Sequence, residues 1–327
     1  MKLKKGIYDA IGIGSALLDF IVEVDDKFIE RLGLTKGNMH LIDARQSKEI
    51  LQLISSMNMY TAPGGSSANT IAGIAMMGGK ASFVGNAGSD ENGRIYIDKT
   101  LEAGATSFIR RGEGITGHAI TFITPDSERT FATHLGAAVE LSADDIDFSI
   151  ISNSSILHLE GYLFESNNLR DVCYRSMKKA KDNGVLISID LSDPALVLRI
   201  RDVFNDVVVH YADIIFANEE EAFAFTGLKE RDALNALSNN SFAAVVKLGA
   251  RGSLIQSEGR VIDIDVVDTD VVNTNGAGDM YAAGLLYGIA SNMSIELSGK
   301  MASYAASLAV SSPWARAETK IDFKGII

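Results

Sequence analysis

The sequence has little cysteine, proline or histidine, and it has no long uncharged apolar run. Its single cysteine, Cys173, cannot form an internal disulfide, which suits a reducing cytoplasm, and it falls in a helix-like run where we expect a core residue. The five histidines show no metal-ligand spacing, so no zinc site is predicted. No apolar stretch reaches the roughly 18 uncharged residues that would span a bilayer.

Positive charge is also scarce. The chain carries 42 acidic and 30 basic residues, a net charge of -12 and a pI near 4.9. Such a surface disfavours nucleic acid and anionic membranes, so phosphate binding must come from a local site and a small substrate is expected. Asp9 and Asp19 interrupt the apolar run after the lysine-rich start, and no small-residue cleavage site follows. We therefore predict no targeting segment and a cytoplasmic location.

The 327 residues, 46% apolar and 22% charged, describe a folded protein of one large domain or two moderate ones. There are four prolines and no repeat or low-complexity linker, which favours one domain over residues 1–327. Short apolar runs alternate with amphipathic segments, a pattern typical of a mostly parallel α/β sheet flanked by helices. The expected strands are Ala10–Gly14, Ala81–Gly85, Ser155–Leu159, Val185–Asp190, Asp213–Ala217 and Ala243–Leu248. The expected helices are Ser66–Met77, Gly93–Ala103, Leu169–Asn183, Pro194–Val209, Glu219–Phe225, Met280–Ala290 and Ser294–Ser311.

Two regions depart from this alternation of strands and helices. Residues 20–42 and 106–134 have strand-like alternation without intervening helices, and we predict that these insertions pair as a small β-sheet lid. The edges of such a lid can pair between chains or stay unpaired. Both a monomer and a lid-mediated homodimer therefore remain open.

The loop before the 280–290 helix carries the strongest chemical signal. Gly276, Ala277 and Gly278 have too little side chain to shield the backbone, so their N–H groups can converge on an anion at the positive end of the helix. Asp279 would lie within reach of that anion. A carboxylate there repels phosphate unless it takes a proton from an attacking alcohol, which predicts phosphoryl transfer. The alternative is a glycine-rich loop in which Asp279 is an ordinary N-cap.

A second glycine-rich loop precedes the 66–77 helix. Gly64 and Gly65 let a polar ligand approach the backbone, and Asn69, one turn into the helix, can donate to and accept from a hydroxyl. A tight turn with a capped helix is the alternative. Asp19 follows the first strand, and its carboxylate could accept hydrogen bonds from two vicinal hydroxyls.

Two further strand ends carry polar residues. Asn218 and Glu221 stand one turn apart at the start of a helix and could hold water ligands of Mg²⁺, or they could belong to a solvated helix N-terminus. The segment 247–252 sets Lys247 beside a glycine turn, which fits either a nucleotide-phosphate platform or a hairpin. All these signals fall at carboxyl ends of predicted strands, where open α/β sheets bind ligands.

Two common nucleotide motifs are excluded. The third glycine position of a dinucleotide fingerprint beginning at Gly12 is Leu17. Neither glycine-rich loop is followed by the Lys-Ser/Thr pair of a Walker P-loop.

The chain resembles the PfkB, or ribokinase-like, carbohydrate kinase family from its first strand to its terminal helix. GGSSANTIAGIAMMGG matches the N-terminal signature of that family, NTNGAGDMYAAGLLYG matches the C-terminal one, and NEEEA lies between them. Within the family, GSALLD, TKGNMHLID and TNGAGD are most similar to adenosine kinases and to bacterial adenosine-kinase-like sugar kinases. The resemblance implies a Rossmann-like domain with a β-lid that moves the γ-phosphoryl of ATP to an alcohol, with Mg²⁺ as cofactor.

The resemblance also implies roles for single residues. Asp19 would bind the ribose 2′- and 3′-hydroxyls, Asp279 would be the base for the 5′-hydroxyl, and the 276–278 amides would form the anion hole. The remaining implied positions are Gly64, Gly65 and Asn69 in the sugar site, Asn218 and Glu221 in the magnesium-linked motif, and Asn218, Lys247, Gly249, Gly252 and Thr274 in the ATP site.

Some positions depart from the family pattern. Asn273 stands where an aspartate associated with a monovalent-cation site is usual, which argues against potassium activation and leaves K⁺ as an alternative cofactor only. Ser15 stands where adenosine kinases often have Asn. Aromatic candidates for an adenine clamp are Phe20, Phe131, Tyr162 and Phe164, which could equally be core or lid residues. Adenosine is the expected acceptor; ribose, fructose, inosine and guanosine are alternatives, and a non-catalytic sensor is a distant one.

Overall fold

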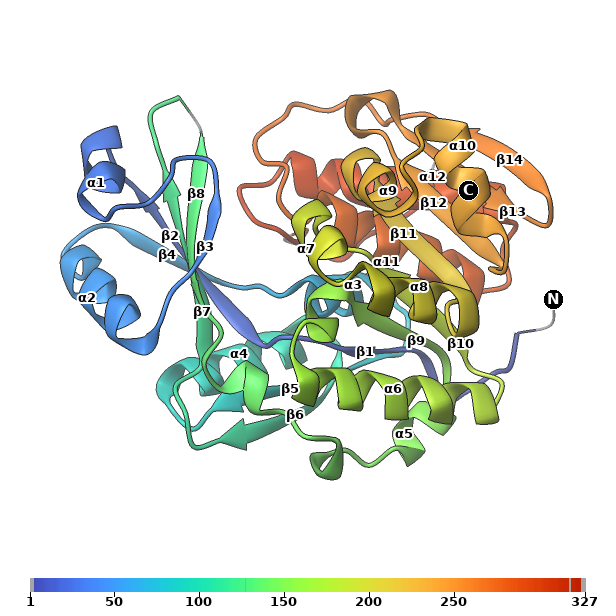
Figure 1. Cartoon of the computed structure of the whole chain (residues 1–327), viewed down its shortest axis with the longest axis horizontal. Helices are drawn as coiled ribbons and strands as arrows, with labels where there is room; N and C mark the ends of the chain where they lie inside the picture. The colour runs from blue at the N-terminus through green and yellow to red at the C-terminus, as the bar shows by residue number, and fades with distance from the viewer. Residues whose placement is uncertain (1–2, 127, 318, 325–327) are drawn as a thin grey trace.

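A computed structural model describes residues 3–324 apart from 127 and 318, and it contains two β-sheets of unequal size (Figure 1). The larger sheet has nine strands in the order β14-β13-β12-β11-β10-β9-β1-β5-β6. All neighbouring strands are parallel except the pairs β12–β13 and β13–β14. The strands are β1 Tyr8–Ile13, β5 Ala81–Gly88, β6 Thr106–Gly112, β9 Ser154–Glu160, β10 Leu186–Asp190, β11 Ile214–Asn218, β12 Ala243–Lys247, β13 Ser253–Ser257 and β14 Arg260–Ile264. The predicted mostly parallel α/β fold is confirmed.

Helices cover both faces of the larger sheet because its strands are apolar on both sides. In β11, Ile214 and Phe216 enter one core while Ile215 and Ala217 enter the other. One core includes residues of α3 Ser66–Met76, α4 Glu91–Glu102, α11 Ala277–Ala290 and α12 Ile295–Val310. The other includes residues of α5 Ser149–Ser152, α6 Asn167–Asp182, α7 Pro194–Arg199, α8 Arg201–His210, α9 Glu219–Thr226 and α10 Glu230–Ser238. Short 3₁₀ turns lie at Gly136–Glu140, Ala143–Asp145, Gly161–Phe164 and Gly249–Arg251.

The strand order reverses at β1. From β1 the chain adds β5 and β6 on one side, and it then returns to place β9 on the other side of β1. In open parallel sheets this reversal leaves a crevice at the carboxyl ends of the strands, where ligands bind. The polar residues that end β9, β10, β11 and β12 all lie at this edge.

The smaller sheet has the order β3-β8-β7-β2-β4 and stands beside the carboxyl edge of the larger one (Figure 1). Its strands are β2 Leu17–Glu23, β3 Met39–Leu41, β4 Met59–Pro63, β7 Gly117–Ile123 and β8 Arg129–His134. Alternation in β2 buries Leu18, Phe20 and Val22 on one face, which α1 Asp26–Arg31 and α2 Ala44–Ile54 help to cover. Asp19 and Ile21 lie on the opposite face and are only partly buried.

The boundaries predicted for the lid differ from those of the smaller sheet. The start of the predicted 106–134 insertion is β6, which pairs with β5 at the edge of the larger sheet. An edge strand with one covered face has the same alternation as a lid strand, so the sequence pattern could not separate them. The predicted 20–42 insertion contains α1, β4 lies outside both ranges, and position 127 lies outside the described residues.

The other predicted elements recur with small shifts. Cys173 is buried in α6, as expected, and the helix predicted over 194–209 is divided into α7 and α8 at Ile200. No helix in the part of the chain that the structure describes combines the length and hydropathy of a membrane span.

Glu160, at the end of β9, connects the two loops that approach the crevice. Its Oε1 accepts a hydrogen bond from the Ser15 N–H at 2.9 Å, and its Oε2 accepts one from the Ser67 N–H at 2.8 Å. The side chain is buried, and that burial raises its pKa. Glu160 therefore fixes the start of α3 against the end of β1.

Replacing Glu160 should destabilise the fold. Glu160→Ala leaves two buried N–H groups without acceptors, and we expect the free energy of unfolding to fall by about 3 kcal/mol in urea denaturation. Glu165→Ala, which removes only an exposed partner of Arg199, is the control and should cost less than about 1 kcal/mol. Equal effects of the two substitutions would contradict this role of Glu160.

Candidate active site

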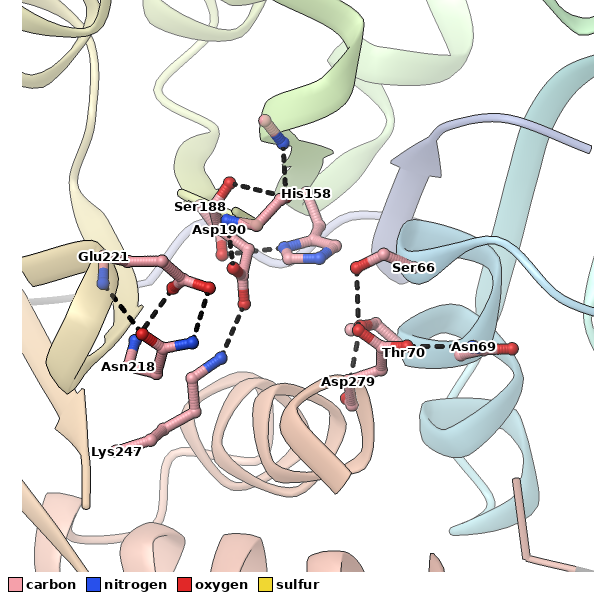
Figure 2. A network of polar contacts seen from close by, with 12 residues as sticks. Ser66, Asn69, Thr70, His158, Ser188, Asp190, Asn218, Glu221, Lys247 and Asp279 are labelled. Carbon is pink, nitrogen blue, oxygen red and sulfur yellow. Dashed lines mark hydrogen bonds and ion pairs between the residues drawn. The ribbon is translucent and has the colours of Figure 1, made fainter. Parts of the chain in front are cut away.

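The candidate site lies where strand ends and helix starts converge. Asp190, Asn218 and Lys247 are the last residues of β10, β11 and β12. The N-termini of α3 and α11 reach the same edge and bring Ser66 and Asp279. Figure 2 shows the two groups facing one another, with Lys247 and Asp190 on one side and Asp279 with its partners on the other.

Asp279 receives hydrogen bonds from three residues of α3, two to its carboxylate and one to its backbone carbonyl. Its Oδ1 accepts from Ser66 Oγ at 2.7 Å and its Oδ2 accepts from Asn69 Nδ2 at 2.8 Å, while Thr70 Oγ1 donates to its backbone carbonyl at 3.2 Å (Figure 2). Burial raises the pKa of Asp279 to about 6, although the two side-chain hydrogen bonds oppose the shift. The carboxylate is thus held in place and suited to accept a proton near neutral pH.

The N-terminus of α11 is open to an anion. Gly276 is the N-cap at a φ of 74°, and no side chain caps the helix, so the alternative in which Asp279 is an ordinary N-cap is wrong. A Cβ at Gly276 would lie 2.0 Å from the Ala315 carbonyl oxygen, which explains the need for glycine. A Cβ at Gly278 would lie 3.0 Å from Lys247 Nζ, so the ammonium faces the first turn of the helix.

Lys247 supplies positive charge beside the N-terminus of α11. Its Nζ lies 3.0 Å from Asp190 Oδ2, and both side chains are largely buried. Burial alone would lower the pKa of Lys247, but Asp190 and Glu221 outweigh it and hold the pKa above its ordinary value. Lys247 therefore stays charged beside the N-terminus of α11, and this combination of an ammonium group with the positive end of a helix suits an anion.

Asn218 and Glu221 form a capping box. The carboxylate of Glu221 accepts from Asn218 N and Nδ2, both at 2.8 Å, and the Glu221 N–H donates to Asn218 Oδ1 at 2.8 Å. Burial raises the pKa of Glu221 to about 7, with Lys247 opposing the shift. Within the described chain there is no group of three or more His, Cys, Asp or Glu arranged for a metal. These donors fit an ion held through water and phosphate oxygens, as Mg²⁺ usually is.

Asp19 lies over the first glycine loop. A Cβ at Gly64 would lie 2.6 Å from Asp19 Oδ1, and Gly65 has a φ of 90° with the Ser15 carbonyl oxygen 2.2 Å from its ideal Cβ. Burial raises the pKa of Asp19 to about 7; Arg316 lowers it and Asp279 raises it. Because the described residues give this carboxylate no hydrogen bond, it can accept two from a ligand.

The remaining predicted residues shape the neighbouring loops. Gly249 and Gly252 both have positive φ in the turn between β12 and β13, so the hairpin interpretation is confirmed. Thr274 is exposed, and its carbonyl accepts from the Ala277 N–H at 3.3 Å. Asn273 is buried; its Nδ2 donates to the Pro313 carbonyl at 3.0 Å, a bond that the aspartate expected by resemblance could not make.

The aromatic candidates divide into two groups. Phe20 packs near His118 with ring centroids 5.4 Å apart on the covered face of the smaller sheet, and Phe164 packs near Phe204 at 5.9 Å. Both are core residues. Phe131 shares the sheet face of Asp19, and Tyr162 is partly exposed with its hydroxyl 3.3 Å from the Ser192 carbonyl oxygen.

Four polar residues of the site escaped sequence reasoning. Glu160 and Asp190 each end an apolar strand, and that position was a readable signal. Ser66 lies inside the quoted glycine motif. Arg316 follows α12 and reaches the site only because the end of the chain folds back, so no local pattern could reveal it; its Nε donates to Asn69 Oδ1 at 2.6 Å.

A carboxylate held at an open helix N-terminus, a lysine beside it and a second carboxylate over a glycine loop suit the transfer of a phosphoryl group to a hydroxyl. The pfkB family carbohydrate kinase model matches residues 29–321, and the chain belongs to that family. It is a sugar or nucleoside kinase.

Three relatives illustrate the range of the family. An adenosine kinase of Sinorhizobium meliloti has 33% identity, with a TM-score of 0.87 over 96% of this chain and 97% of that one. A probable sugar kinase of Rhizobium etli has 31% identity, with a TM-score of 0.89 over 96% of each chain. The adenosine kinase of Saccharomyces cerevisiae is 26% identical over 324 residues, 91% of this chain and 93% of the yeast protein.

Breaking the ion pair of the site should destabilise the protein. Lys247→Met leaves the buried Asp190 carboxylate without its cation, and we expect urea denaturation to show a loss of about 3 kcal/mol. The double variant with Asp190→Leu should recover only part of that loss, because the Ser192 N–H then loses its acceptor. Lys178→Met, which removes an exposed partner of Asp182, should cost less than about 1 kcal/mol. A cost that small for Lys247→Met would mean that the pair does not hold the site together.

Proposed function

We propose that this kinase transfers the γ-phosphoryl group of ATP to the 5′-hydroxyl of adenosine. The observation that carries the proposal is the Asp279 carboxylate, held by α3 at the open N-terminus of α11 beside Lys247. The resemblance of Asp19 and Asn69 to the sugar site of the family supports a ribose acceptor.

In the proposed mechanism, Asp19 binds the vicinal hydroxyls of the ribose and thereby fixes the sugar between the two sheets. The small sheet then acts as a lid that excludes water and limits wasteful hydrolysis. Asp279 accepts the proton of the 5′-hydroxyl as its oxygen attacks the γ-phosphorus in line. The N–H groups of residues 276–278 and the Lys247 ammonium stabilise the charge that develops on the phosphoryl oxygens. Mg²⁺, bound through water near Asn218 and Glu221, would neutralise the phosphates.

A nucleoside is favoured over a free sugar by the face of the smaller sheet that carries Asp19. The register places Ile21, Tyr60, Phe131, Met39 and Leu41 on that face, and Met39, Leu41 and Tyr60 are 47%, 57% and 51% exposed. A purine would cover apolar surface that ribose or fructose is too small to reach. Similarity to a probable sugar kinase keeps the free sugar as the second candidate.

Asp279→Asn tests the proposed base. The amide cannot take the hydroxyl proton, so turnover of adenosine should fall by a factor on the order of 10² or more while ATP binding and the unfolding midpoint change little. A coupled ADP-release assay would measure turnover, and calorimetry would measure ATP binding. Asp25→Asn alters the N-cap of α1, away from the site, and serves as the control. Turnover near that of the unchanged protein would remove Asp279 from the role of base.

The cation dependence tests the consequence of Asn273. Its amide nitrogen already donates to the Pro313 carbonyl, where a monovalent cation would need an acceptor and a negative charge. We expect replacement of potassium by tetramethylammonium at equal ionic strength to change kcat by less than about twofold. A tenfold loss that potassium alone restores would show that the cation site is intact despite the substitution.

A further inference from the structure

Arg316 is a cation that the segment after α12 contributes to the site. It follows α12, and only 8% of its surface is exposed. Its Nε donates to Asn69 Oδ1 at 2.6 Å, and an Nη lies 3.4 Å from the Gly64 carbonyl oxygen. A buried guanidinium is costly unless its donors are used and its charge is matched. Residues of the acceptor site accept from Nε and one Nη, and the nearby Asp19 and Asp279 carboxylates offset the positive charge.

The bond to Asn69 fixes the orientation of the Asn69 amide. A side-chain amide has an acceptor at one end and donors at the other. Because a guanidinium only donates, it must face Oδ1, and Nδ2 is then directed to Asp279 Oδ2 at 2.8 Å. With the amide reversed, the Asn69 oxygen would face the carboxylate and repel it. Arg316 therefore determines that Asp279 receives a hydrogen bond from this side.

The second contact reaches the loop beneath Asp19. The Gly64 carbonyl near Arg316 also accepts a hydrogen bond from the buried Tyr96 hydroxyl at 2.9 Å. Gly64 in turn lies directly against the Asp19 carboxylate. Arg316 and Tyr96 thus both bind the Gly64 carbonyl and fix the backbone against which the Asp19 carboxylate packs.

The charge of Arg316 acts on both carboxylates. Burial lowers the pKa of Arg316, while Tyr96, Asp19 and Asp279 raise it. In return, Arg316 lowers the pKa of Asp19 more than any other group does, whereas burial raises it. The other charged or titratable groups that act on these two carboxylates include Glu160 of β9, Asp190 of β10, Lys247 of β12, Arg129 of β8, Tyr96 of α4 and Tyr162 of the 161–164 turn.

We infer that Arg316 is a positioning residue that couples acceptor binding to the base: it orients the Asn69 amide toward Asp279 and holds the Gly64 carbonyl of the loop beneath Asp19. The inference rests on the proposed function, since it deepens the account of the same site. It assigns catalytic importance to a segment of the chain that lies outside both glycine-rich motifs.

A hollow behind the site gives access for a chemical test. Arg316 lines a cavity of about 610 Å³, together with Trp314, Ala315 and Lys99 and the adjoining strand β4. A small guanidinium ion could therefore enter and occupy the place that Arg316→Ala vacates.

The pH dependence of kcat/KM separates a positioning role from a purely structural one. For Arg316→Ala we expect kcat at pH 7 to fall about tenfold and the acid limb to move up by about one pH unit, because ionised Asp279 loses a favourable charge. Guanidinium chloride at millimolar concentration should recover part of kcat. Arg316→Lys keeps the charge but not the directed bond, so its acid limb should stay near that of the unchanged protein while kcat remains low.

Two comparisons make the test decisive. Arg170→Ala removes a similar bond, from Nε to the Phe164 carbonyl, that involves neither Asn69 nor the two carboxylates, and it should leave the pH profile unchanged. If Arg316 acts through Asn69, the loss of kcat from Arg316→Ala should be several-fold smaller in an Asn69→Ala background. An unchanged acid limb, no response to guanidinium and additive effects with Asn69→Ala would together overturn the inference.

A measurement that does not depend on catalysis distinguishes failure of this inference from failure of the proposed function. Carbon-13 NMR of labelled aspartate carboxyls, with Asp279 and Asp19 assigned through Asp279→Asn and Asp19→Asn, reports both titrations directly. We expect both pKa values to rise in Arg316→Ala. If no acceptor is phosphorylated, the proposed function fails, yet the titration still decides on Arg316; unchanged titrations would refute its role even in an active kinase.

Discussion

The hydrogen-bonded contact between α3 and Asp279 at the start of α11 is the constraint on which the site depends. Ser66 and Asn69 come from the first glycine loop and Asp279 comes from the second, more than 200 residues later in the chain. Because α3 and α11 pack together over the larger sheet, the two motifs meet at its carboxyl edge. The acceptor pocket and the candidate base therefore form one unit, and a shift of either helix would separate them.

Burial of charge distinguishes this site from the strongly acidic surface around it. Asp19, Asp279 and Glu221 all have pKa values raised to between about 6 and 7, with burial as the main cause in each case. Lys247 opposes the shifts of Glu221 and Asp279, and Arg316 opposes the shift of Asp19. Such perturbed groups gathered in a crevice are characteristic of functional sites rather than of structural ion pairs alone.

Much of this arrangement was readable from sequence, because polar residues that end apolar strands must meet at one edge of a parallel sheet. That rule located Asn218 and Lys247, whereas clustered small residues located both glycine loops. It could not assign β6, since an edge strand of the large sheet alternates like a strand of the small one. It also missed α2, although Asp43 and Gln46 form a capping box there. The rule could not identify Arg316, because only tertiary folding brings that part of the chain to Asn69.

The central claim is that a single hydroxyl of the acceptor lies between Asp279 and the N-terminus of α11. A crystal structure with adenosine and a non-hydrolysable ATP analogue tests this most directly. The account predicts the 5′-oxygen within hydrogen-bond distance of an Asp279 carboxylate oxygen, the ribose diol on Asp19 and the terminal phosphate at the 276–278 amides. Adenosine bound with its 5′-oxygen directed away from Asp279, or phosphate bound elsewhere, would contradict the account.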